Sequence, residues 1–86
     1  MQLARFLNSV FKNDGFILVD AQSKNYIIGS PKSDKPIKVK ILDKKLYYKL
    51  LLHPDLYFGE AYTNGDIIIE NGSLSEFLDL ALMNFG

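Results

Sequence analysis

The chain of 86 residues contains no cysteine, no tryptophan and only one histidine. The absence of cysteine excludes a disulfide framework, a thiolate nucleophile and a cysteine-ligated metal. The longest apolar runs have three or four residues, whereas a membrane-spanning helix needs roughly 20. The opening residues, Met1–Phe6, lack the apolar core and the small-residue cleavage site of a secretory leader. We therefore expect one small cytoplasmic domain.

Sequence signatures of catalysis are also absent. The six glycines are scattered and form no Gly-x-Gly loop that could hold a nucleotide phosphate or S-adenosylmethionine. His53 has no second histidine nearby to complete a metal site, and Pro54 follows it directly, which is typical of a helix end. No serine stands in a Gly-x-Ser-x-Gly elbow. We expect a noncatalytic chain that holds neither a cofactor nor a metal.

Bases and acids are separated along the sequence, although the net charge is zero. Residues 1–50 hold all ten bases and four acids, whereas residues 51–86 hold six acids and no base. Lysines crowd between residues 32 and 49, where a shared face would attract phospholipid headgroups or nucleic-acid phosphates. Alternatively, they only keep an edge strand and a helix surface soluble. The candidate membrane contacts among them are Lys38, Lys40, Lys44 and Lys45.

Apolar spacing predicts the elements of the first half. Leu3, Phe6, Leu7, Val10 and Phe11 form one helical stripe, and the helix should stop near Asn13. Short β-branched runs over residues 16–20 and 26–29 predict a hairpin. The polar, proline-containing stretch 30–36 should be a mobile loop, and strict alternation over residues 37–41 predicts a half-buried strand.

The second half is predicted to be mainly helical. One helix should run from Leu46 toward His53 with Asp43 as its cap, and another should cover residues 54–62 with Gly65 near its end. A strand over residues 66–70 precedes a capping box, Ser73 and Glu76. The last helix carries an apolar stripe of Leu74, Phe77, Leu78, Ala81, Leu82 and Phe85.

Together these elements predict a single α+β domain over residues 1–86. The order is α-β-β-β-α-α-β-α, with a small, mostly antiparallel sheet covered on one side by helices.

Five large rings are concentrated in the two middle helices. A phenol has an apolar body and a polar tip, which suits a cavity mouth or a membrane-facing surface. Ordinary core packing, with hydroxyls reaching solvent, is the alternative. The candidate lipid contacts are Tyr47, Tyr48, Tyr57 and Phe58, and Tyr62 completes the cluster.

The segment Leu56–Asp66, with the sequence LYFGEAYTNGD, resembles a family signature. It is similar to the Gly-Glu-(Ala/Ser)-Tyr-x-x-Gly motif in the N-terminal domain of cyclopropane-fatty-acyl-phospholipid synthases, which are lipid methyltransferases. The motif residues here are Gly59, Glu60, Tyr62 and Gly65. The order of elements also resembles the sterol carrier protein fold, in which helices and a sheet enclose a lipid cavity.

The resemblance implies an N-terminal accessory module of a longer methyltransferase, whose catalytic domain would lie beyond this segment and bind S-adenosylmethionine. The implied partners are that domain and a phospholipid or membrane surface, reached from the cytoplasm at the inner face of the membrane. Nucleic acid is not expected, because the chain as a whole is neutral and carries no nucleic-acid motif. The alternatives are a homodimerisation or interdomain packing module, and a free-standing lipid carrier.

Overall fold

The structure, a computed structural model, describes residues 1–85, and every predicted element is present in them. The elements are α1 (Gln2–Val10), β1 (Gly15–Val19), β2 (Asn25–Gly29), β3 (Lys38–Ile41), α2 (Leu46–Leu52), α3 (Pro54–Thr63), β4 (Ile67–Glu70) and α4 (Leu74–Phe85). The predicted order α-β-β-β-α-α-β-α is confirmed.

The four strands form one open, mixed sheet in the order β2-β1-β3-β4. β1 and β2 are an antiparallel hairpin, and β3 pairs antiparallel with β4. β1 and β3 are parallel, because the chain leaves β2 through the loop 30–37 and returns on the other edge of β1. The expectation of a mostly antiparallel sheet therefore holds for two of the three pairings.

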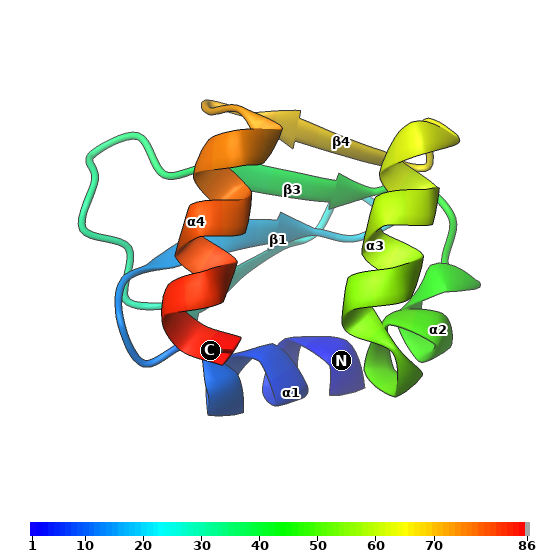
Figure 1. Cartoon of the computed structure of the whole chain (residues 1–86), viewed down its shortest axis with the longest axis horizontal. Helices are drawn as coiled ribbons and strands as arrows, with labels where there is room; N and C mark the ends of the chain where they lie inside the picture. Colours follow the sequence, from blue (N-terminus) through cyan, green and yellow to red (C-terminus); the bar gives the residue numbers. More distant parts are fainter. Residues whose placement is uncertain (86) are drawn as a thin grey trace.

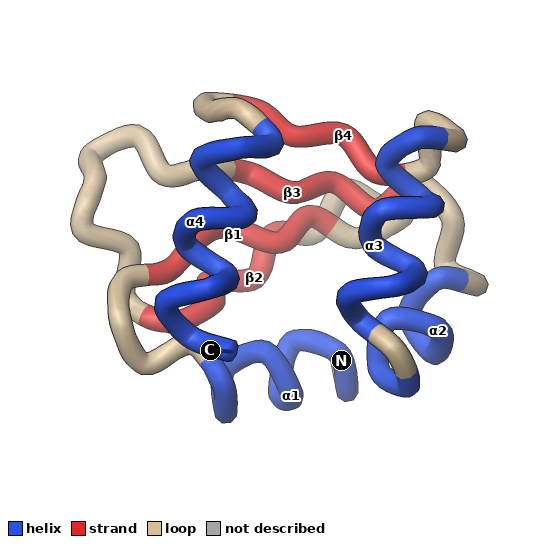
Figure 2. Tube along the Cα trace, viewed as in Figure 1, coloured by secondary structure: helices blue, strands red, loops and turns tan. Residues whose placement is uncertain are grey.

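The helices lie on one face of this sheet, with α4 in front of one end of the strands, α3 in front of the other end and α1 along the β2 side (Figures 1 and 2). Successive side chains of a strand point to opposite faces. Leu18, Val39 and Ile41 point toward the helices and are buried, whereas Lys38 and Lys40 point the other way. No helix of residues 1–85 covers that second face.

The first helix ends earlier than its apolar stripe predicts. α1 stops at Val10 because the backbone of Phe11 is extended, so the predicted end near Asn13 was wrong by about one turn. The turn that follows places Asp14 at a positive φ of 64°. Gly15 is required after it, because a Cβ there would collide with the carbonyl oxygen of Ile28 on the paired strand.

The two predicted caps have different outcomes. At α4 the capping box is confirmed: the Glu76 N–H donates to Ser73 Oγ at 3.1 Å, and the Ser73 N–H donates to Glu76 Oε1 at 3.0 Å. Asp43 is not the N-cap of α2. A helix capped by Asp43 would begin at Lys44, whereas α2 begins at Leu46 and its N-cap is Lys45. Its carboxylate instead accepts a hydrogen bond from the Lys45 N–H in the preceding turn.

One side chain of α1 covers the outer edge of the sheet. Asn8 Oδ1 accepts a hydrogen bond from the Gly29 N–H at 2.8 Å, and Asn8 Nδ2 donates to the Ile27 carbonyl at 3.2 Å. The amide thus satisfies backbone groups of β2 as a neighbouring strand would, which protects an edge that could otherwise pair with another chain.

Within residues 1–85, no helix has the length and apolar character needed to cross a bilayer.

Candidate functional site: an apolar cavity

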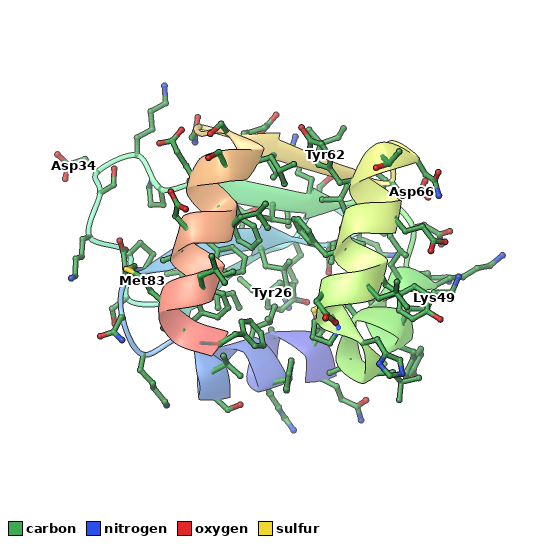
Figure 3. The ribbon with its side chains drawn as sticks, in the orientation of Figure 1. Tyr26, Asp34, Lys49, Tyr62, Asp66 and Met83 are labelled. Carbon is green, nitrogen blue, oxygen red and sulfur yellow. The ribbon has the colours of Figure 1, made fainter. Side chains whose placement is uncertain are left out.

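The space between α3, α4, α1 and the sheet is an apolar cavity of about 450 Å³. Every element except β2 contributes to its wall, and Asp55 is the only charged lining residue. Figure 3 shows the side chains that enter this space between the two front helices. The sheet supplies the floor through residues of β1, β3 and β4: Phe16, Leu18, Val39, Ile41 and Ile67.

Five phenylalanines and six leucines make up most of the walls. All six of the chain's phenylalanines form one connected series of ring contacts, with centroids 5.0–6.4 Å apart. The series runs from Phe58 on α3 to Phe77 on α4, whose ring also packs edge-on against Phe16 of the floor. It continues through Phe11 to Phe85, at the other end of α4, and then to Phe6. Aromatic contacts therefore hold α4 to both the sheet and α1.

The predicted stripe of α4 faces the cavity. Five of its six residues line the space, namely Phe77, Leu78, Ala81, Leu82 and Phe85. Leu78, Leu82 and Phe85 are also exposed, and together with Asp55 they form what we call the cavity mouth. The stripe of α1 contributes Leu3, Leu7 and Phe11 in the same way.

Of the predicted lipid contacts, only Phe58 lines the cavity. Tyr48 is exposed on the outside of α2, and Tyr57 lies half-buried beneath the Lys49 ammonium, whose Nζ is 5.6 Å from its ring centroid. Tyr62 is exposed near the end of α3 (Figure 3). The structure thus separates the tyrosines from the apolar cavity.

Tyr47 holds α2 to a neighbouring turn. Its hydroxyl accepts a hydrogen bond from the Ala21 N–H at 2.8 Å and so joins α2 to the turn between β1 and β2. In that turn, Tyr26 donates to Asp20 Oδ2 at 3.2 Å. Burial raises the pKa of Tyr26, and the hydrogen bond to the Asp20 carboxylate raises it further.

The four lysine candidates divide between two places. Lys38 and Lys40 lie on the uncovered face of the sheet, where Lys40 pairs with Glu70 at 3.3 Å. Lys44 and Lys45 are exposed in the turn that begins α2. The four candidates therefore come from two different segments, the strand β3 and the turn before α2.

The motif residues of the family resemblance lie on or just beyond α3, outside the cavity lining. Gly59, Glu60 and Tyr62 are exposed on the helix, and a Cβ at Gly59 would meet open space. Gly65 has a φ of +81°, which a side chain disfavours, and it directs the chain from the helix into β4.

Apart from Phe58, the cavity-lining phenylalanines were not identified as site residues from the sequence. The other four, Phe11, Phe16, Phe77 and Phe85, are far apart in the sequence and meet only in the folded chain. The available signal was that three of them, Phe11, Phe77 and Phe85, stand on the apolar stripes of the first and last helices, which were interpreted as core positions. Within residues 1–85, no group of three or more acidic or histidine side chains is placed to hold a metal ion.

Comparison with known proteins does not add to this description. The chain matches no known family model, and the searches of curated proteins and of solved structures gave no match.

Proposed function

We propose that this chain is a noncatalytic lipid-binding module whose apolar cavity takes up a hydrocarbon chain. The observation that carries the proposal is an apolar space of about 450 Å³ inside a domain of 86 residues. The space is open to solvent at its mouth, and contiguous apolar surface of this kind on a small domain often marks a binding groove. A space of this size and composition is suited to an apolar occupant.

The size of the cavity fits an acyl chain. A dry apolar cavity of about 150 Å³ holds a benzene molecule, and the present volume is about 450 Å³. By proportion it accommodates on the order of eighteen carbon atoms. The volume also falls in the range typical of small-ligand sites.

The polarity of the lining supports a ligand that enters with its apolar end. No buried polar or charged side chain is found within residues 1–85, so nothing inside the cavity would pair with a headgroup. Burying a polar group without a hydrogen-bond partner is unfavourable. A headgroup would therefore remain at the cavity mouth.

We further propose that the module serves a lipid methyltransferase, as the resemblance of Gly59, Glu60, Tyr62 and Gly65 to the cyclopropane-fatty-acyl-phospholipid synthase motif suggests. In that role it would present lipid to a separate catalytic domain that binds S-adenosylmethionine, and would work at the inner face of the membrane. A sterol carrier protein-like fold agrees with this proposal, because there too helices and a sheet enclose the lipid. A free-standing lipid carrier would use the same cavity.

Filling the cavity tests the proposal. Ala81 lines the space from the middle of α4, so Ala81→Phe should occupy part of it and weaken binding of a fluorescent acyl probe about tenfold or more, since roughly one aromatic ring of volume is lost. The measurement is a fluorescence titration of the purified chain with the probe.

The matched control is Ser75→Phe, which adds a similar ring at an exposed position on the same helix outside the cavity lining. It should leave probe binding unchanged. Equal binding by the wild-type chain and the Ala81 variant, with both folded by circular dichroism, would contradict the proposal. A tight dimer in light scattering without affinity for the probe would favour the packing module instead.

A further inference from the structure

The outer side of α2 and the start of α3 carry apolar side chains that the fold does not cover. Tyr48 is 69% exposed, Leu52 is 74% exposed and Leu56 is 59% exposed. Tyr48 and Leu52 are four residues apart in α2, so they share one side of that helix. Exposed bulky apolar residues gathered in this way indicate an interaction surface.

Lysines surround these apolar residues. Lys45 stands three residues before Tyr48 and Lys49 three residues before Leu52, and Lys44 is exposed in the turn just before α2. The only ion pair within residues 1–85 joins Lys40 to Glu70, so none of these three ammonium groups is neutralised by an acid. Lys49 lies on the side of the molecule away from α4 (Figure 3).

We propose that this surface docks the protein on an anionic lipid bilayer. The docking surface consists of Lys44, Lys45, Tyr48, Lys49, Leu52 and Leu56. Cationic side chains attract anionic headgroups, while leucine and tyrosine side chains enter the boundary between headgroups and acyl chains. Nucleic acid would use the lysines but would leave the two leucines exposed to water, so the combination favours a bilayer.

The docking surface is continuous with the cavity along the chain. Pro54 and Asp55 line the cavity and stand between Leu52 and Leu56 of the docking surface. Docking would therefore bring this side of the cavity mouth close to the bilayer, from which an acyl chain could enter. This inference rests on the proposed lipid-binding function, and it assigns the source of the lipid.

The test compares binding to phosphatidylcholine vesicles with and without phosphatidylglycerol, measured by flotation of the purified chain. We expect binding only to the vesicles that contain phosphatidylglycerol, and weaker binding as salt is raised. The double substitution Lys44→Gln and Lys45→Gln should lower the partition coefficient on the order of thirtyfold. The matched control changes Lys32 and Lys35 to Gln, which removes the same charge from the exposed loop 30–36, and it should retain binding.

The apolar contribution needs its own pair of variants. Leu52→Ser with Leu56→Ser should also release the protein from the vesicles, whereas Ile27→Ser changes a residue that is 66% exposed on the uncovered sheet face and should not. Retained binding by the leucine variant would overturn the proposal, as would equal losses in the two lysine variants. Salt-dependent binding to RNA but not to vesicles would assign the lysines to nucleic acid.

The two proposals can fail separately. The Ala81→Phe variant should bind vesicles normally, because its cavity is filled but its docking surface is intact. A wild-type chain that binds the acyl probe yet ignores anionic vesicles would overturn the docking surface and leave the cavity proposal standing. Binding to anionic vesicles without binding of the acyl probe would overturn the cavity proposal and leave the docking surface standing.

Discussion

At the scale of single residues, Asp20 organises the turn between β1 and β2. Its carboxylate accepts hydrogen bonds from the backbone N–H groups of Gln22 and Lys24, and from the Tyr26 hydroxyl. Burial by itself would raise the pKa of Asp20, but these hydrogen bonds, with the nearby Lys24 charge, outweigh it and hold the pKa below its ordinary value of 3.8. The ionised carboxylate is therefore the form that the fold stabilises.

This lowered pKa predicts how stability depends on pH. Because the folded-state value is the lower one, Asp20 stabilises the fold above its unfolded-state pKa of 3.8, and that contribution is lost as pH falls through the lower, folded-state pKa. Asp20→Asn should therefore lower the free energy of unfolding near neutral pH and reduce its loss in acid. Urea unfolding of both proteins at several pH values checks this, and a difference between them that stays constant with pH would contradict it.

The positions of the tyrosines and phenylalanines show which site residues could be predicted from the sequence. The tyrosines are close together in the sequence, which made them the visible candidates, yet Tyr47 joins α2 to a turn and Tyr48 is on the outer surface. The phenylalanines are far apart in the sequence, but they meet around the cavity. Clustering along the chain identified only Phe58 of this site, because long-range packing brings the other phenylalanines together.

At the scale of elements, α4 depends on Asn84 for its attachment at the C-terminal end. Asn84 Oδ1 accepts hydrogen bonds from the backbone N–H groups of Lys12 and Asn13, both at 2.8 Å. Its Nδ2 donates to the Asn13 carbonyl at 3.0 Å and to the Leu80 carbonyl at 2.9 Å. This amide fixes one wall of the cavity to the segment between α1 and β1.

Asn84→Ala should therefore lower the free energy of unfolding by about 1–2 kcal/mol, since several partly exposed hydrogen bonds are lost. It should also weaken acyl-probe binding, because the wall formed by α4 is no longer held in place. Urea unfolding and the probe titration measure the two effects. Ser75→Ala, at an exposed position on the same helix, is the control, and an Asn84 variant as stable as that control would contradict the assigned role.

The order of the elements and the starts of α3 and α4 could be predicted, because they depend on local chemistry, whereas the end of α1 and the cap of α2 could not. The capping box at Ser73 and Glu76 and the proline that begins α3 mark helix starts that do not depend on the rest of the fold. The stripe of α4 was also identified correctly as an apolar face. What it faces could not be read from periodicity, since a stripe against solid packing and a stripe against a cavity have the same spacing.

At the scale of the whole molecule, the topology depends on interactions that no local pattern records. Alternation predicted β3 as a strand with Val39 inward and its lysines outward, and the fold agrees. Alternation does not specify which edge of β1 receives β3. The parallel pairing of β1 and β3 follows from the path of the loop 30–37, and this pairing makes the sheet mixed.

The separation of charge along the sequence also has a consequence for the whole molecule. Residues 51–86 contain six acids and no base, and all four residues of the cavity mouth lie among them. Asp55 is the only charged residue of the lining. A carboxylate headgroup held at this mouth would meet a like charge, whereas an uncharged headgroup would not.

We therefore expect the chain to bind a long-chain alcohol more tightly than the carboxylate of equal length, by about fivefold for one exposed like charge at close range. Asp55→Asn should narrow this difference by improving carboxylate binding. Glu60→Gln removes the same charge from an exposed position of α3 outside the cavity lining, and it should leave the ratio unchanged. Displacement of a fluorescent acyl probe by the two ligands gives the ratio, and tighter binding of the carboxylate would show that a base reaches the mouth from the first half of the chain.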